Sequence, residues 1–295
     1  LEGINGAAVA LQQAERLRNQ TAARDSELDV RMMVVPHHMY VAEEISEAWT
    51  RLRAGSNPSV IVLVGPNHDD LGVTDIQTTD GRWMTPWGYV ETDSQLVDSL
   101  LAVGASKTTE VWMRDHSIGV HIPYIAALFP DTKIVPITYR HQAALPEAKT
   151  VLDQLLPRLP KDAVFVYSID FSHYLTAEEA RKKDIETLQW MTPIPNFDAI
   201  DQAGADHFDS HASVNMFLQS SVMYGCERQV SCYGNSGDLA HDSTGPTTSY
   251  FIWMCDNKPV DTISIHAGGD LMFTRGIRAV RERRGAQNFM HDIAV

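Results

Sequence analysis

The sequence predicts an α/β fold, specifically a three-layer sandwich around a mostly parallel central sheet. Short β-branched apolar runs alternate with helical stretches along the chain, an order that is typical of sheets covered by helices on both faces. Several of these runs also end abruptly in Pro or Gly followed by a histidine. A composition of 44% hydrophobic and 21% charged residues in 295 is that of an ordinary globular protein and allows one large domain or two modest ones.

The first unit of the chain is a strand, a helix and a strand. Residues 60–64 are apolar and mostly β-branched, and residues 30–35 are apolar apart from Arg31, which predicts buried strands. Residues 41–53 carry apolar side chains at intervals of three and four, which predicts a helix, and the Gly, Ser, Asn and Pro of residues 55–58 end it. Such a βαβ unit should be right-handed and parallel.

The remainder of the chain continues this alternation. Residues 114–130 predict one helix capped by Asp115 or Ser117, and the aromatic residues 82–89 predict a loop or hairpin. Further strands are expected at residues 75–79, 133–139, 163–168, 229–233 and 249–254, with a Gly-rich turn at 234–237. Further helices are expected at residues 7–24, 95–103, 144–159, 176–191 and 197–203, and towards the end of 206–218.

Charge and hydropathy limit the classes of partner. Asp and Glu number 38 against 24 Lys and Arg, which gives a formal charge of -14 and argues against a nucleic-acid footprint. A small anionic substrate held by a local cluster remains compatible with this balance. No apolar run approaches the ~20 residues that cross a bilayer, so we expect no membrane-spanning segment. The oligomeric state is not predicted by these features.

The three cysteines do not form a disulfide framework in a chain of this length. Cys226 and Cys232 could pair across a hairpin-like turn, which would fit an oxidising compartment. Free buried thiols are an equally good interpretation.

Histidines follow three of the predicted strands. Residues 30–35 lead to His37 and residues 60–64 lead to His68, and we expect both side chains to project from neighbouring strand ends into one pocket. Residues 163–168 lead to Asp170 and His173. Ligands of α/β proteins bind at the carboxyl edge of the sheet, and neutral imidazole suits zinc, copper, iron and nickel. The pattern therefore predicts a metal site at this edge.

Four motifs resemble those of a known family. PHHMY, GPNHDD, DHSIGVHIPY and DFSHY occur in this order and are similar to PHAGY, GPNHH, EHSIExxLP and DxSHY of the Memo family, whose bacterial members are called AmmeMemoRadiSam system protein B. The resemblance covers about residues 30–254. It implies a fold similar to that of class III extradiol ring-cleaving dioxygenases, with a metal at the strand ends.

The resemblance also implies the site residues. His37 and His68 match two metal ligands of the family, and Asp209 matches the position of its third ligand, a cysteine. A register shifted by one or two residues would offer His207 or His211 instead. Two histidines and a carboxylate form the facial triad of non-haem iron(II) oxygenases, so Fe(II) is favoured as the cofactor, with Zn, Mn or Cu as alternatives.

His116, Asp170 and His173 match other pocket residues of the family. The resemblance implies that they are the catalytic residues: a histidine would be the general acid or base, and Asp170 would orient it. The family's Ala and Gly in PHAGY are His38 and Met39 here, which would narrow the pocket. His121 is expected to be packed or at the surface. His141 and His291 are expected to be exposed to solvent.

The last part of the chain has a separate resemblance. Residues 261–277 are similar to the opening of the capsule-synthesis CapA family, in which Asp270 would bind metal. An alternative is a strand and helix docked on the main body. We therefore expect a Memo-like α/β domain over residues 1–260 and a strand–helix segment over 261–295. The CapA resemblance would imply the cell envelope, and the cytoplasm is the other expected location.

Three functions follow from these observations. The first is a non-haem, iron-dependent oxidoreductase of the dioxygenase-like kind acting on a small molecule. The second is a zinc or manganese hydrolase. The third is a non-catalytic metal-binding or interaction module. A binding module needs no proton-transfer pair, so His173 and Asp170 favour an enzyme, although fold alone does not fix function.

Overall fold

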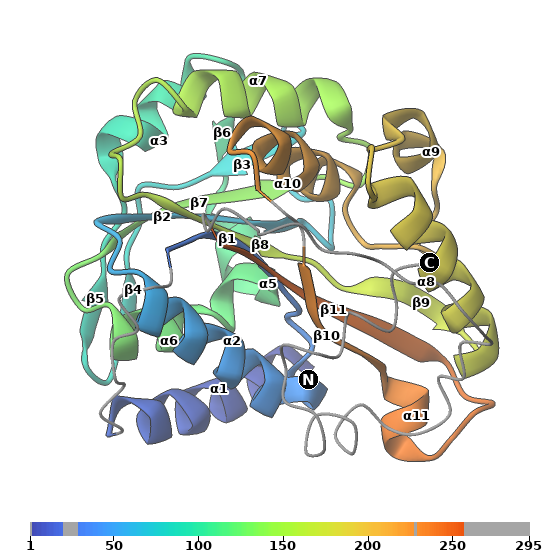
Figure 1. Cartoon of the computed structure of the whole chain (residues 1–295). Coiled ribbons are helices and arrows are strands. Elements are labelled where there is room, and N and C mark those ends of the chain that lie inside the picture. The colour runs from blue at the N-terminus through green and yellow to red at the C-terminus, as the bar shows by residue number, and fades with distance from the viewer. Residues whose placement is uncertain (1, 20–28, 227–228, 257–295) are drawn as a thin grey trace.

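A nine-stranded mixed sheet forms the centre of the protein in the computed structural model, which describes residues 2–19, 29–226 and 229–256 (Figure 1). Its spatial order is β10-β11-β1-β8-β2-β7-β3-β6, and β9 pairs with β11. A separate two-stranded hairpin is formed by β4 (Trp83–Thr85) and β5 (Gly88–Val90). The strands of the large sheet are β1 (Val30–Val35), β2 (Val60–Pro66), β3 (Ile76–Thr78), β6 (Ser106–Lys107), β7 (Lys133–Tyr139), β8 (Val164–Ser168), β9 (Phe171–Leu175), β10 (Gln229–Asn235) and β11 (Thr247–Asp256).

Helices cover both faces of this sheet, which gives the predicted three layers (Figure 1). Helices α3, α7 and α10 lie on one face, and α1, α2 and α6 lie on the other. The helices are α1 (Glu2–Arg18), the 3-10 turn Met39–Val41, α2 (Ala42–Gly55), α3 (Ser94–Leu101), α4 (Thr109–Arg114), α5 (His116–Gly119), α6 (Ile122–Leu128), α7 (Leu145–Leu155), α8 (Ala177–Met191), α9 (Phe197–Gln202), α10 (His211–Met223) and α11 (Ser236–Ala240).

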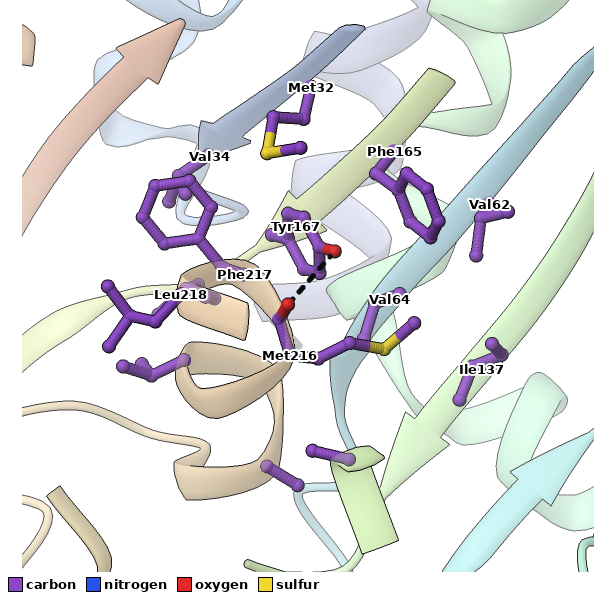
Figure 2. Packing of buried hydrophobic residues seen from close by; sticks show 14 of the residues in the cluster. Met32, Val34, Val62, Val64, Ile137, Phe165, Tyr167, Met216, Phe217 and Leu218 are labelled. Carbon is purple, nitrogen blue, oxygen red and sulfur yellow. Dashed lines mark hydrogen bonds between the residues drawn. The ribbon is translucent and has the colours of Figure 1, made fainter. Parts of the chain in front are cut away.

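Two hydrophobic cores result from the alternation of side chains along the central strands. Met32 and Val34 of β1 belong to the core under α3, α7 and α10, whereas Met33 and Val35 belong to the core under α1, α2 and α6. Figure 2 shows the first core, in which the Tyr167 hydroxyl donates to a backbone carbonyl of α10. A strand buried on both faces reads as one continuous apolar run, which explains why the sequence showed β1 and β2 clearly.

The parallel strands β1, β8, β2 and β7 place their carboxyl ends at one edge of the sheet. The expectation that His37 and His68 follow neighbouring strands is wrong, because β8 lies between β1 and β2. This insertion matters for the site. It places Ser168, the last residue of β8, and Asp170 between the two histidine-bearing strand ends.

Three local predictions require correction. Residues 114–130 do not form one helix but the end of α4, then α5 and α6, because Pro123 is tolerated only in the first turn of a helix and a new helix must begin there. Residues 171–175, for which no strand was predicted, form β9 against β11. The expected turn at 234–237 is the end of β10 followed by α11. Asp115 does cap α5, as predicted, by accepting from the backbone N–H of Ser117.

The predicted pairing of Cys226 with Cys232 is also wrong. Cys226, which follows α10, is disulfide-bonded to Cys255 of β11, and their Cα atoms lie 5.6 Å apart. The reason is the pleat of the sheet. Cys226 and Cys255 belong to the core on the α10 side, whereas Cys232 packs against the core on the opposite face. Cys232 is a free thiol.

Within the described residues, no helix combines the length and the apolar character needed to cross a membrane. The predictions for residues 261–295, for Asp270 and for His291 lie outside the described residues, as do the last residues of the helix predicted at 7–24.

Candidate metal centre

His37 is the buried centre of the cluster at the carboxyl edge of the sheet. Its Nδ1 lies 2.9 Å from Ser168 Oγ, and its backbone N–H donates to Asp170 Oδ1 over 3.1 Å. Its other ring nitrogen, Nε2, lies 3.3 Å from Asp209 Oδ2 and 3.5 Å from Asp170 Oδ2. Two carboxylate oxygens therefore lie close to one imidazole nitrogen. Burial, followed by the nearby charges of His68 and His116, holds the pKa of His37 well below its ordinary value.

Asp209 approaches His37 because two peptide segments cross at this point. The backbone N–H of Asp209 donates to the carbonyl of Asp170 over 3.1 Å, and the N–H of Asp170 donates to Asp209 Oδ2 over 3.0 Å. Asp209 Oδ1 is buried without a hydrogen-bond partner. Burial and the negative charge of Asp170 raise the pKa of Asp209 well above its ordinary value. A buried carboxylate with an unpaired oxygen requires a compensating group.

His68 is oriented by a carboxylate of its own. Both its backbone N–H and its Nδ1 contact Asp115 Oδ2, over 2.7 and 3.0 Å. Burial lowers the pKa of His68, but the hydrogen bond and charge of Asp115, with the charges of Asp209 and Asp170, outweigh burial and raise it to about 9. Asp115 thus fixes the ring through Nδ1 and leaves Nε2 for another partner, an arrangement that is typical of metal-ligating histidines.

His116 completes a group of three histidines. Its ring stacks on that of His68 with centroids 4.6 Å apart, and the centroid of His37 lies 5.2 Å from it. One ring nitrogen from each of His37, His68 and His116 can be chosen so that all three lie within 4.8 Å of one another. These three residues could hold a metal ion. His116, which was predicted to be an acid–base residue, lies among the possible ligands.

His173 lies close enough to the centre for Asp170 and His68 to affect its pKa, which burial lowers below its ordinary value. Its Nδ1 is buried without a hydrogen-bond partner. The expected orienting hydrogen bond from Asp170 is absent among the described side chains, because the two Asp170 oxygens face His37. Asp170 therefore positions His37 rather than His173.

The two alternatives to Asp209 are engaged elsewhere. The ring of His207 contacts Thr187 Oγ1 over 2.9 Å and Lys183 Nζ over 3.3 Å. The Nε2 of His211 lies 2.7 Å from the carbonyl of Ala203. Among the three candidates for a third ligand, Asp209 is the one with an oxygen 3.3 Å from His37 Nε2.

The donor set fits a divalent cation. An imidazole nitrogen without a proton and two carboxylate oxygens are all hydrogen-bond acceptors, so they repel one another unless a cation or a proton lies between them. Atoms bound about 2.1 Å from one metal ion lie about 3.0 to 3.4 Å apart at octahedral and tetrahedral angles. The distances from His37 Nε2 to Asp209 and Asp170, 3.3 and 3.5 Å, are close to this range.

Several parts of the centre were not predicted. Asp115 was expected only as a helix cap, and the His68 contact depends on the position of α5, which sequence spacing does not give. Ser168 and His121 were not expected in the site. His121 was expected to be either packed or at the surface, and it is fully buried. His141 is exposed, as predicted, and pairs with Asp70.

Fold and centre together define a class: an α/β protein with a cluster of histidines and carboxylates at the carboxyl edge of a parallel sheet. The chain belongs to the Memo-like protein family, whose family model matches residues 6–250. The resemblance inferred from the four motifs is thereby confirmed. Residues 261–295 lie outside this match, and the CapA resemblance stays a prediction.

The relatives span most of the chain. Identity is 32% over 219 residues to the MEMO1 family protein of Aquifex aeolicus, covering 71% of this chain and 80% of that protein. It is 26% over 227 residues to the MEMO1 family protein of Methanopyrus kandleri, covering 71% and 78%. The crystal structure of the uncharacterized protein JW3007 from Escherichia coli covers 75% of this chain and 99% of its own, with a TM-score of 0.44 and 13% identity, a similarity too low to bear on function.

Proposed function

We propose that this protein is a metal-dependent enzyme in which His37, His68 and Asp209 bind one divalent ion, and that it is a non-haem oxidoreductase acting on a small molecule. The observation that supports this proposal is that Asp209 Oδ2 and Asp170 Oδ2 lie 3.3 and 3.5 Å from His37 Nε2. With the His37 proton on Nδ1 and both acids ionised, all three atoms are acceptors, and a cation would satisfy them together.

Two histidines and one carboxylate favour Fe(II) over the softer Cu(I), because an oxygen ligand replaces the thiolate that the resemblance places at the Asp209 position. When bound, Fe(II) would supply redox chemistry at the coordination positions that the protein leaves open. The remaining residues are the protein's own contribution. Asp115 contacts the Nδ1 of His68, and Asp170 accepts a hydrogen bond from the backbone N–H of His37. Such supporting carboxylates fix the ligand geometry.

His173 is the proposed acid–base residue. Its Nδ1 has no hydrogen-bond partner although it is buried, so it is free to exchange a proton with a substrate in the pocket. His116, whose ring stacks on that of His68, is either a further ligand or a second group that holds a proton. A variant His173→Gln should therefore keep its metal and lose turnover, whereas loss of metal would make His173 a ligand.

Metal analysis of protein purified without oxygen tests the proposal. Wild-type protein should contain about one ion per chain with iron in excess of zinc, and Asp209→Ala should contain none. His211→Ala is the matched control, since His211 is the shifted-register alternative and should retain the ion. Retention of metal by Asp209→Ala with loss in His211→Ala would overturn the ligand assignment. Zinc or manganese alone in the wild type, with oxygen-independent turnover, would favour the hydrolase.

A further inference from the structure

His121 lies beside the metal centre without belonging to it. It precedes α6 and is fully buried. Its Nδ1 lies 3.3 Å from the indole Nε1 of Trp49 on α2, and its Nε2 lies 3.1 Å from the hydroxyl of Ser168. Ser168 is the same residue that contacts His37 Nδ1. A continuous series of hydrogen bonds therefore runs from the α2 face of the sheet to His37.

The direction of each of these hydrogen bonds can be derived. An indole N–H only donates, so His121 Nδ1 accepts from Trp49. Burial lowers the pKa of His121 to about 3, so the ring is neutral and carries one proton. Because Nδ1 accepts, this proton lies on Nε2, and Nε2 donates to the Ser168 hydroxyl oxygen.

Ser168 has one proton and two lone pairs to distribute. Its Oγ lies 2.7 Å from the carbonyl oxygen of Ser117, which can only accept, so the hydroxyl proton goes there. One lone pair accepts from His121 Nε2. The other faces His37 Nδ1 at 2.9 Å, so His37 must donate with a proton on Nδ1. Every donor and acceptor of the hydroxyl is then satisfied.

The carbonyl that receives the Ser168 proton is itself held in place. The hydroxyl of Ser117 donates to the carbonyl of Pro66 over 2.9 Å. Gly65 lies directly against it, since a Cβ at this position would be 2.8 Å from Ser117 Oγ. The close approach of β2 and α5 therefore depends on this glycine.

We propose that Trp49, His121 and Ser168 form a positioning relay that keeps His37 in the Nδ1–H tautomer, with the Nε2 lone pair directed at Asp209 and Asp170. The relay rests on the proposed function, because a bare Nε2 serves to bind metal. In the other tautomer Nε2–H would donate to the two carboxylates, and a proton would take the place of the cation. His121 and Ser168 are thus positioning residues that act through His37.

The tautomer can be read directly in metal-free protein by long-range proton–nitrogen NMR of the imidazole rings, with His37→Ala used to assign the signals. The relay predicts that His37 carries its proton on Nδ1 between pH 6 and 8. It also predicts that Ser168→Ala shifts the ring towards the Nε2–H tautomer. A wild-type His37 with its proton on Nε2 would overturn the proposal. This result would not depend on whether the protein binds metal, so it separates failure of the relay from failure of the proposed function.

Affinity for Zn²⁺, measured by competition with a fluorescent chelator, gives a second readout. Ser168→Ala should weaken binding by about 10- to 100-fold, the usual effect of losing a partner of a metal ligand. His121→Leu should weaken it in the same direction. His121→Gln is the matched control, because its amide can accept from Trp49 and donate to Ser168 and should restore most of the affinity.

A double-mutant cycle completes the test. If His121 acts through Ser168, then His121→Leu should add little to Ser168→Ala. Independent, additive losses, or an affinity for Zn²⁺ that neither single variant changes, would contradict the relay. Thermal unfolding of each variant identifies any that fail to fold, and the wild-type NMR measurement needs no variant beyond the assignment control.

Discussion

Two buried carboxylates of this protein have opposite surroundings. Asp184 of α8 accepts from three hydroxyls, those of Ser172 over 2.6 Å and of Tyr233 and Ser249 over 2.7 Å each. These hydroxyls lie on β9, β10 and β11, so one carboxylate joins a helix to three strands. Burial raises the pKa of Asp184 to about 6 against the opposing effect of the hydroxyl donors.

The Asp209 side chain is 8% exposed and its pKa is raised for the same first reason, but no hydroxyl donates to it. One of its oxygens has no partner, and the other accepts from the backbone N–H of Asp170 and lies 3.3 Å from His37 Nε2. The comparison separates two ways to stabilise a buried carboxylate. Hydrogen-bond donors can satisfy its oxygens, and the residue is then structural, or a cation can satisfy them, and the residue is then part of a binding site. Burial and a raised pKa alone do not distinguish the two.

The largest expected effect is the loss of metal from the centre. His37→Ala and His68→Ala should each abolish stoichiometric metal while the fold is kept, because both residues follow strand ends rather than lie in the core of a strand. Asp184→Asn should retain full metal. Elemental analysis together with circular dichroism checks both expectations, and two folded histidine variants with full metal would refute the centre.

A pH effect on stability should belong to Asp184. Its pKa is about 6 in the folded protein and 3.8 ordinarily, so between these values the folded state holds a proton that the unfolded state has lost. Stability should therefore fall as pH rises from about 4 to 6, by about 3 kcal/mol in total, and change little from this cause above that range. The free energy of unfolding in urea of Asp184→Asn minus that of wild type should increase by this amount between pH 4 and 6. A constant difference would show that Asp184 makes no such contribution to the pH dependence.

Asp170→Asn should weaken metal binding by about 10- to 100-fold without abolishing it, as expected for a residue that orients a ligand. The amide would present a donor to His37 Nε2, where a carboxylate oxygen now lies 3.5 Å away. Competition titration with Mn²⁺ measures the effect. Complete loss of metal would make Asp170 a ligand, and an unchanged affinity would remove it from the centre.

A smaller effect is expected on the choice of metal. Asp209→Cys should shift the relative affinity from Mn(II) or Fe(II) towards Zn(II) or Cu(I) by about tenfold or more, since thiolate is the softer ligand. Asp184→Cys is the control, because a thiol there faces hydroxyls instead of histidines. If the relative affinity for the harder metals, Mn(II) or Fe(II), and the softer ones, Zn(II) or Cu(I), is the same in wild type and Asp209→Cys, then Asp209 is not a ligand.

The sequence predicted the strands that carry the centre because each is buried on both faces along most of its length and is therefore largely apolar. It predicted His37 and His68 because they interrupt these runs. It did not predict that β8 separates β1 from β2, since strand order depends on how later segments insert into the sheet. For that reason the contact between Ser168 and His37 could not be foreseen.

The same limit applies to contacts made by side chains from distant segments. Asp115 was recognised as a cap from its position before α5, but its contact with His68 depends on where α5 packs. The pairing of Cys226 with Cys255 depends on which face of the sheet each occupies, and a separation of 29 residues gave no sign of it. Asp209 was found through a motif, because no periodic pattern surrounds it.

Anomalous X-ray scattering at the iron edge, from crystals grown without oxygen in the presence of Fe(II), tests the central claim most directly. The account predicts one peak at the carboxyl edge of the sheet, bonded by His37 Nε2, His68 and an oxygen of Asp209. A centre without a peak, in which a protonated Asp209 donates to His37 Nε2, would contradict it.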